Sequence, residues 1–249
     1  MEIAPELAEL FGVYVGDGTM SARKDRRPSL AITAGKDEKE WLEHVANLFE
    51  QTLNYRVKVR WDSNVYKIHA RTSKICEFFN KAGFPIGEKS LTVKAPRAVI
   101  ETEDEYIYEA FLRGYFDADG SLTFEKKPHR GRAEFMGIYH YYPRIALTSI
   151  SKELILTDIT QMLEKVGFRY NTCVRKPSKK GKNKVYIAAI AGATQLEFWV
   201  KEVGSSNPVY LSKYDVWKRF RFCPPRTTLE QRRMMLSGEL DPEIFYKNM

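Results

Sequence analysis

The chain has 249 residues, 43% of them hydrophobic, which is enough to bury a sizeable core in one large domain or two smaller ones. Its formal net charge of +8 favours a polyanionic partner. No apolar run approaches the length of a membrane span, and the N-terminal residues lack a signal-peptide pattern, so we expect nucleic acid rather than a membrane. Three widely spaced cysteines indicate buried or semi-buried thiols in a reducing cytosol, which predicts a cytoplasmic protein, or an organellar one in a eukaryotic host.

Two segments about a hundred residues apart resemble each other. Residues 10–18 read LFGVYVGDG and residues 112–120 read LRGYFDADG. Each predicts a helix that ends on Asp-Gly and carries two small residues four positions apart, on one face: Gly12 with Gly16, and Gly114 with Ala118. Small residues at this spacing let two helices approach closely. We therefore expect the helices to pair, which would bring Asp17 and Asp119 side by side.

The same order of elements follows each Asp-Gly. The predicted strand 28–33 parallels 143–148, and an amphipathic helix comes next in each half, the second beginning after Ser151 and ending before Gly167. A hairpin then spans 55–70 in the first half, where Val57, Val59 and Trp61 should share one face, and about 170–187 in the second. Short helices ending near Gly83 and Gly204 close the halves. The chain thus reads as two αββαββα halves, like a fused symmetric dimer.

The two Asp-Gly acids are in an unfavourable electrostatic position. A carboxylate at a helix C-terminus faces the negative end of the dipole, which costs up to about 1 kcal/mol, and two neighbouring carboxylates repel each other. A single Asp-Gly is usually only a turn. An unfavourable carboxylate at the C-terminus of a helix, found twice in equivalent places, indicates function. Two carboxylates, helped by the backbone carbonyls of Gly16 and Ala118, would suit Mg²⁺, which supports phosphodiester hydrolysis.

These segments resemble the paired motifs of the LAGLIDADG homing endonucleases, in the single-chain form with two motifs, over nearly the whole chain up to about Phe222. Residues 116–120 are close to the family pattern, whereas Val15 stands where the family has its first Asp. The metal-binding acid of the motif matches Asp17 and Asp119. The resemblance implies an α+β fold whose motif helices pair and whose curved antiparallel sheets form a saddle for DNA. It also implies that Lys89 and Lys213 act as catalytic residues near the scissile phosphates.

Basic residues are concentrated where such a saddle would touch DNA. Arg56, Lys58 and Arg60 alternate with apolar residues, and loops carry the rest. Most would contact phosphates, while strand residues are better placed to read base edges. The loop candidates are Arg23, Lys24, Arg26, Arg27, Lys126, Arg130, Arg132, Lys176, Lys180 and Lys182.

We divide the chain into a first half at 1–100, a second at 101–222 and a C-terminal extension at 223–249. In the extension we expect a short helix over Thr228–Ser237 with Arg232 and Arg233 exposed. This extension would either brace the second half or touch DNA, and the sequence leaves both open.

The leading hypothesis is a monomeric, site-specific, metal-dependent endonuclease that cuts double-stranded DNA at a long asymmetric target, with Mg²⁺ as cofactor and Ca²⁺ or Mn²⁺ as substitutes. The alternative is a nucleic-acid-binding protein without cleavage activity, either an intron maturase that binds RNA or a DNA-binding regulator. A third is an unrelated basic α+β enzyme with Asp-Gly turns. The chain ends lack self-splicing residues, which favours an intron-encoded or domesticated protein over an excised intein.

Overall fold

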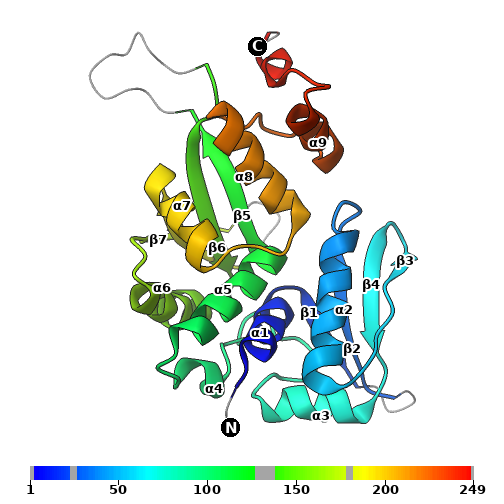
Figure 1. Cartoon of the computed structure of the whole chain (residues 1–249). Coiled ribbons are helices and arrows are strands. Elements are labelled where there is room, and N and C mark those ends of the chain that lie inside the picture. The colour runs from blue at the N-terminus through cyan, green and yellow to red at the C-terminus, as the bar shows by residue number, and fades with distance from the viewer. Residues whose placement is uncertain (1–2, 23–26, 127–137, 178–181, 248–249) are drawn as a thin grey trace.

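The computed structural model describes residues 3–22, 27–126, 138–177 and 182–247. The chain forms two similar halves that meet along a central pair of helices (Figure 1). The elements of the first half are α1 (Pro5–Asp17), β1 (Gly18–Ser21), β2 (Ser29–Ala34), α2 (Lys39–Leu53), β3 (Arg60–Asp62), β4 (Val65–Ala70) and α3 (Ser73–Lys81), followed by the short α4 (Arg97–Ile100).

The second half repeats this order. Its elements are α5 (Glu105–Asp119), β5 (Gly120–Glu125), β6 (Tyr142–Ser149), a π-helix η2 (Leu154–Ile159) continuing as α6 (Thr160–Val166), β7 (Asn171–Arg175), β8 (Val185–Ala191) and α7 (Ala193–Glu202). A further helix, α8 (Pro208–Phe220), precedes the extension, which contains α9 (Leu229–Ser237) and the 3₁₀ helix η3 (Pro242–Tyr246). The predicted α+β fold of two αββαββα halves is confirmed.

Each half contains one antiparallel four-stranded sheet. The strand orders are β1-β2-β4-β3 and β5-β6-β8-β7, so the two sheets, called A and B here, have equivalent topologies. Helices cover one face of each sheet: α2 and α3 in the first half, α7 and α8 in the second (Figure 1). Leu30, Ile32 and Ile68 of sheet A point into this core, as do Ile145 and Leu147 of sheet B.

The opposite face of each sheet, called the outer face here, is set by the strand register. In sheet A, Ile32 pairs with Ile68 on the core side, so Ala31 and His69, which also pair, lie on the outer face. Thr33 pairs with Lys67 on the same outer face. In sheet B, Ile145 pairs with Ile190 in the core, and the outer face carries the pairs Ala146–Ala189 and Thr148–Ile187.

The first hairpin is shorter than its sequence predicts. Strand β3 covers only Arg60–Asp62, whereas residues 55–59 form no ladder with a neighbouring strand. The alternation itself holds at Val57, which is buried, and at Lys58, which is exposed. Trp61 departs from it: its side chain is 52% exposed and lies edge-on against Tyr66. Trp61 reaches past the edge of the sheet, where no helix covers it.

The C-terminal extension packs against both halves. Helix α9 begins at a capping box in which the Thr228 and Gln231 side chains bond each other's backbone N–H groups, close to the predicted start. Arg233 is exposed and pairs with Glu40 of α2 at 2.8 Å, which links the extension to the first half. The prediction that Arg232 is exposed was wrong: its side chain is 2% exposed and donates to oxygen atoms of α8.

Helix ends and two of the three cysteines agree with the sequence. Gly167 ends α6 with φ +93, and the Ser151 hydroxyl caps the start of the preceding helix by accepting from Leu154 N–H. The thiols of Cys76 and Cys223 are buried, but that of Cys173 is exposed on the edge strand β7. Within the described ranges, no helix combines the length and apolar character that a bilayer crossing needs.

Candidate active site

Helices α1 and α5 touch backbone to backbone. A Cβ atom built on Gly12 would lie 2.2 Å from the Phe111 carbonyl oxygen, and one built on Gly114 would lie 2.1 Å from the Glu9 carbonyl oxygen. Gly16 faces Ala118, whose Cβ lies 2.6 Å from a Cβ built on Gly16. The structure therefore brings together all four small residues that the sequence proposes for this interface, and none of the three glycines has room for a side chain.

The two motif acids lie at the ends of this helix pair. Asp17 is the last residue of α1 and Asp119 the last of α5. The Asp119 Cβ lies 3.2 Å from the position of a Cβ on Gly16, the neighbour of Asp17, so both acids occupy one small region. Burial, with repulsion from Asp119 and Glu38, raises the pKa of Asp17 to about 7 despite Lys89. Burial also raises the pKa of Asp119 to about 6, opposed by Lys89.

Lys89 is the cation of this site. Its side chain is buried, and its ammonium donates to the carbonyl oxygens of Val15 at 2.6 Å and Gly16 at 3.2 Å, at the C-terminal end of α1. Burial lowers its pKa to about 8, while attraction to Asp119 and Asp17 acts in the opposite direction. An ammonium has three donors, so one remains for a further acceptor.

An open cavity of ≈ 300 Å³ adjoins these groups. Lys89 and Asp119 line one side, and Thr148 and Val185 from the outer face of sheet B line another. The cavity therefore connects Asp119 and Lys89 to the outer face of sheet B. A ligand lying on that face can reach the Asp119 carboxylate.

Lys213 lies elsewhere, and the structure does not support its predicted place beside the acids. Its ammonium donates to the Leu122 carbonyl oxygen at 3.0 Å and lies 5.3 Å from the centre of the Tyr210 ring. It lines a different pocket, between β5, α8 and the start of the extension. The two halves are therefore unequal: among the described residues, Lys89 of the first half acts on the pKa values of both acids, and Lys213 of the second half does not.

Sequence reasoning missed the polar groups that support the site. Asp117 is 1% exposed, and its carboxylate accepts from the Ser205 hydroxyl and from Ser206 N–H at 2.6 Å. Burial raises its pKa to about 7. Asp117 thereby fixes the loop that leads into α8. The family motif has an acid here, which was the available signal, and Val15 takes the equivalent place in the first half.

A buried ion pair joins the two motif helices. Arg113 of α5 donates two hydrogen bonds to Glu9 of α1, the shorter at 2.7 Å, and His44 contacts the other Glu9 oxygen at 2.6 Å. Glu9 is 3% exposed. The sequence signal was a pair of charges inside otherwise apolar helix faces.

A third acid stands near Asp17. Glu38, at the start of α2, accepts from Gly35 N–H at 2.7 Å and from the Asn207 side chain at 2.8 Å. Asn207 is fully buried and also caps α8. This contact links the loop before α2 to the loop before α8, and it adds negative potential at Asp17.

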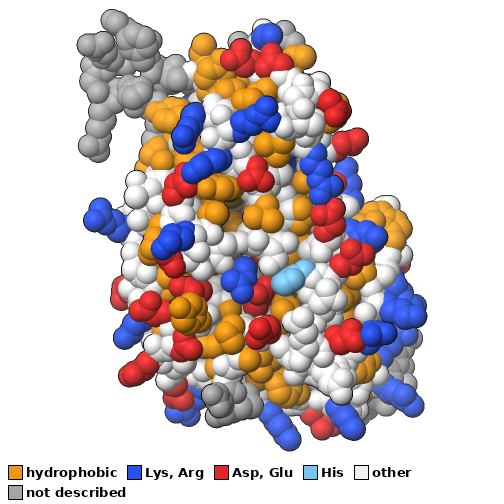
Figure 2. All heavy atoms as spheres, viewed as in Figure 1, with side chains coloured by type: hydrophobic (Ala, Val, Ile, Leu, Met, Phe, Trp, Pro, Cys, Tyr) orange, Lys and Arg blue, Asp and Glu red, His pale blue; other side chains and the backbone are white. Residues whose placement is uncertain are grey.

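The predicted DNA contacts fall into three groups. Arg60 lies on the outer face of sheet A, because it pairs with Lys67. Arg56 instead bonds Glu50 of α2 at 2.7 Å, away from that face. Figure 2 shows Lys and Arg side chains gathered over β3 and β4 at the right-hand edge. Exposed elsewhere are Arg27, Lys58, Lys126, Lys176 and Lys182. Outside the described residues lie Arg23, Lys24, Arg26, Arg130, Arg132 and Lys180.

The comparisons with known proteins agree with this architecture. The profile of the LAGLIDADG-like domain matches residues 107–204. A structure of variants of the homing endonuclease I-DmoI aligns with a TM-score of 0.55 at 17% identity, covering 80% of this chain and 95% of that one. The LAGLIDADG homing endonuclease I-GzeII, bound to its DNA target, aligns at 0.54 and 12% identity over 99% and 95%. The fold is that of the double-motif LAGLIDADG homing endonucleases. The match to the LAGLIDADG-like domain covers the second half of the chain.

The curated proteins similar to this chain are much longer. It is 26% identical over 212 residues to the replication factor C small subunit of Methanocaldococcus jannaschii, which covers 84% of this chain but 10% of that protein. It is also 26% identical over 161 residues to one of the subunits of the A-type ATP synthase of Pyrococcus abyssi, covering 61% of the chain and 15% of that protein. The chain thus spans between a tenth and a sixth of these proteins.

The donor set of the LAGLIDADG acids fits a hard divalent cation. Asp17, Asp119 and the Ala118 carbonyl offer oxygen ligands, whereas the Gly16 carbonyl already accepts from Lys89. Among the described residues, no group of three or more His, Cys, Asp or Glu side chains forms a metal cage. Mg²⁺ typically binds one or two carboxylates and completes its shell with water and substrate phosphate, so two carboxylates suffice. Burial is the main cause of the raised pKa values of Asp17 and Asp119, and the single charge of Lys89 does not offset it.

Proposed function

We propose that this chain is a divalent-metal-dependent endonuclease that cuts double-stranded DNA at a long, asymmetric target. The observation that carries the proposal is the convergence of Asp17, Asp119 and Lys89 where α1 and α5 meet, beside a cavity that opens along the outer face of sheet B. Solved structures of the same fold support it, since I-DmoI is seen in complex with DNA and Ca, at a TM-score of 0.52.

Asp17 and Asp119 would hold the metal, with the Ala118 carbonyl as a further ligand. A bound Mg²⁺ would lower the pKa of a coordinated water and stabilise negative charge on the phosphate. With a cation present, both carboxylates would ionise fully at neutral pH, because their mutual repulsion would be offset.

Lys89 would act on the phosphate directly. Two of its three N–H donors are committed to Val15 and Gly16, which fixes the ammonium in place before DNA arrives. The third can meet a phosphate oxygen and stabilise the charge that develops there. Because the carbonyls hold it, this contact needs little reorganisation.

The outer faces of the two sheets would receive the DNA. Arg60 and His69 of sheet A would read base edges, and exposed basic residues around the sheets would bind phosphates. Lys67 would join them by exchanging its ion pair with Asp62, at 3.0 Å, for a base edge. The net charge of +8 supports this partner. We infer that the protein acts as a monomer, since its two halves already supply both motif acids.

The curated relatives support the idea that this chain is encoded by a mobile DNA sequence. Segments similar to this chain occur in a replication factor, in an ATP synthase and in an aminotransferase, whose names share no activity, and they make up 10% to 15% of each matched protein. The shared part therefore accounts for none of those activities. A sequence that inserts into many genes explains this distribution, and the intron-encoded form expected from the sequence is one version of it.

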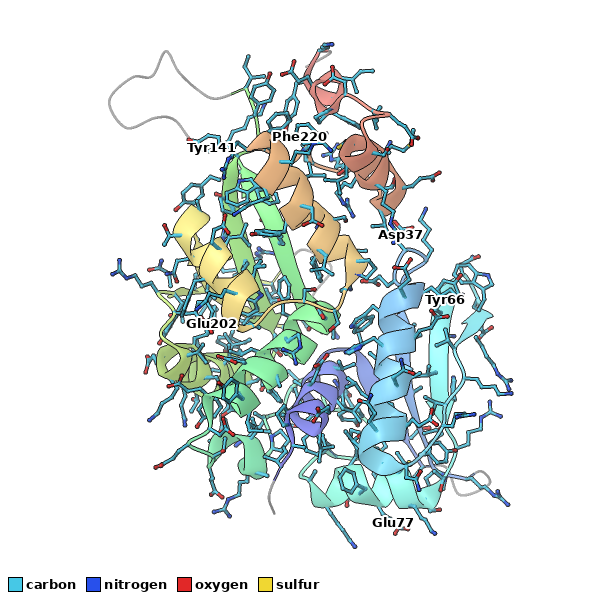
Figure 3. All side chains as sticks on the ribbon, in the orientation of Figure 1. Asp37, Tyr66, Glu77, Tyr141, Glu202 and Phe220 are labelled. Atoms are coloured by element: carbon cyan, nitrogen blue, oxygen red, sulfur yellow. The ribbon has the colours of Figure 1, made fainter. Side chains whose placement is uncertain are left out.

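A cleavage assay tests the proposal. Duplexes enriched by binding from a randomised pool in Ca²⁺ would be transferred to Mg²⁺, where we expect a double-strand cut. Asp17→Asn and Asp119→Asn should each lower the rate at least about 100-fold and keep binding, because each removes a ligand of the metal centre. Glu77→Gln, at an exposed position of α3 (Figure 3), is the matched control and should cut normally.

Binding without a cut in Mg²⁺, Mn²⁺ or any other divalent metal would contradict the endonuclease proposal. It would favour the alternative function, a nucleic-acid-binding protein on the same scaffold. Competition with single-stranded RNA in the same assay would then distinguish a maturase from a DNA-binding regulator.

A further inference from the structure

A second cluster of cations lies away from the motif acids. A pocket of ≈ 360 Å³ opens between β5, α8 and residues 223–227, and Lys213, Arg226 and Arg232 all line it. No Asp or Glu contributes to its described walls. The proposed cleavage chemistry uses none of these three residues.

Arg232 is a buried guanidinium that forms no ion pair with an acid of the described residues. It donates to the Ser212 hydroxyl at 2.9 Å, to the Thr227 carbonyl and hydroxyl, and to the Val209 carbonyl at 3.4 Å, all of which are neutral oxygens. Asp37, in the loop before α2, faces the extension (Figure 3) and is the nearest acid that affects its pKa, but forms no ion pair with it. A buried charge paired only with dipoles is costly.

Lys213 adds a second unpaired charge to the same pocket. Its one protein hydrogen bond goes to Leu122, which leaves two donors free, and no ion pair with a carboxylate occurs among the described residues. Burial and the neighbouring Arg232 lower its pKa. The Cys223 thiol in the pocket wall is not the missing anion, because burial raises its pKa to about 11.

Arg226 supplies an independent sign that the pocket has a use. It follows Pro225 in a turn and has φ +59, a left-handed conformation that favours glycine. Its side chain is exposed at the pocket. A residue that carries this backbone strain while placing a cation beside two others indicates a binding role.

The pocket lies along the path that leads from the acids. Strand β5 begins directly after Asp119, and Leu122, which binds Lys213, is three residues further on, about 10 Å away at the usual rise of a strand. Because β5 is the edge strand of sheet B, its free carbonyls point away from the sheet, toward α8 and the extension.

We propose that this pocket binds a backbone phosphate of the target DNA within a few nucleotides of the bond that is cut, and that residues 223–232 serve to complete it. The inference rests on the proposed function for the choice of DNA as the source of the phosphate. It also gives Lys213 a role other than the catalytic one expected from the sequence. Lys213 would hold the DNA strand in place beside the bond that is cut.

The salt dependence of binding tests the assignment. With duplexes enriched in Ca²⁺, the slope of log binding constant against log salt should fall by about 0.9 in Lys213→Gln, because one phosphate contact releases about that many counterions. Arg226→Gly should give the same fall and a melting temperature at least as high as that of the wild type, since glycine suits the left-handed backbone. A merely structural Arg226 would leave the slope unchanged.

Two further arms locate the contact. Lys218→Gln on α8, whose ammonium pairs with Glu197 at 2.6 Å, is the matched control and should keep the slope. Neutralising single phosphates as methylphosphonates should reveal one position, near the cut, that weakens the wild type at least threefold but not Arg226→Gly.

The outcomes separate the two proposals. Unchanged slopes in both variants, or no such phosphate position, would overturn the pocket assignment while leaving the endonuclease intact. Stabilisation by inorganic phosphate that depends on Lys213, together with unchanged DNA slopes, would assign the pocket to a free anion instead. If the protein enriches no duplex at all, both the proposed function and the binding of a DNA phosphate in this pocket are refuted.

Discussion

At the scale of single residues, the contact between α1 and α5 tolerates no added atom. Gly114→Ala would place a Cβ 2.1 Å from the Glu9 carbonyl oxygen, and this backbone atom cannot rotate away. We expect a loss of more than about 3 kcal/mol in the free energy of unfolding, above the usual cost of overpacking. Gly35→Ala, which meets only the end of the flexible Glu38 side chain at 2.9 Å, is the control. Equal urea midpoints for the two variants would refute the close contact.

The Glu9–Arg113 pair should make stability depend on pH. Burial alone would raise the pKa of Glu9, but hydrogen bonds from His44 and Arg113 bring it below its usual 4.5. An acid with a lowered pKa stabilises the fold above its unfolded pKa, and this contribution is lost as pH falls through the folded pKa. We expect Glu9→Gln to cost about 3 kcal/mol at pH 7, the low end for a broken buried pair because Arg113 keeps 27% exposure.

Urea titrations of wild type and Glu9→Gln between pH 7 and pH 3 measure this difference. The difference in the free energy of unfolding between the two proteins should narrow below about pH 4.5. The raised pKa values of Asp17 and Asp119 affect both proteins equally, so their contribution cancels in this difference. A gap that stays constant to pH 3 would mean that Glu9 does not act through its charge.

The residues that sequence could place are those with a local signature. Asp17 and Asp119 end apolar helices in repeated motifs, so the sequence placed them correctly at the ends of the paired helices. Lys213 could not be placed, because it lies on α8, which begins at Asn207 and Pro208 and directs the lysine along β5. The Glu9–Arg113 contact spans 104 residues, and helical periodicity does not reveal which charges meet across an interface.

At the scale of elements, equivalent strands of the two sheets differ in the chemistry of their outer faces, where the proposed DNA would lie. The outer face of β4 carries Lys67 and the exposed His69, whereas on that of β8 Val185 is partly exposed and Ile187 and Ala189 are buried. Lys and Arg side chains recognise guanine, while apolar side chains contact the thymine methyl group. We expect enriched duplexes to show required guanines in the half-site under sheet A, and weaker, thymine-rich preferences under sheet B.

Base preferences of variants check this assignment. Lys67→Ala should relax one position in the first half-site, at a cost of about 1–3 kcal/mol for that base, and leave the second unchanged. Arg97→Ala, an exposed residue of α4 that pairs with Glu101, is the control. Equally strong base preferences in both half-sites would show that the outer face of sheet B reads bases through other groups.

Element prediction succeeded where burial sets the pattern. The amphipathic helices α2 and α6 and the strands β2 and β6 each bury one face, so periodicity located them. It failed at β3, because a strand at the edge of a sheet is held by one neighbour and its ladder ends where pairing stops. The π-helical turns at Leu154–Ile159 were also missed: they place Asp158 to accept from Ala95 N–H at 2.8 Å, a tertiary contact without a local signal.

At the scale of the whole molecule, the two halves are similar enough to raise the question of why they pair with each other. Gly12 and Gly114, like Asp17 and Asp119, are 102 positions apart, so Glu9 corresponds to Phe111 and Arg113 to Phe11. A dimer of two first halves would place Glu9 against Phe11. Both copies would then bury a carboxylate that has lost its arginine and keeps only the partly exposed His44, and breaking a buried ion pair in this way costs several kcal/mol. The ion pair therefore selects the mixed arrangement as well as stabilising it.

Splitting the chain between its halves tests this selection. Co-expressed fragments 1–96 and 97–249 should assemble one to one, and the first fragment alone should not form a homodimer, as measured by light scattering at micromolar concentration. Glu9→Leu removes the buried charge, so the first fragment should then self-associate through its glycine face. Self-association of the unmodified fragment at the same concentration would show that shape alone, and not the ion pair, governs which halves meet.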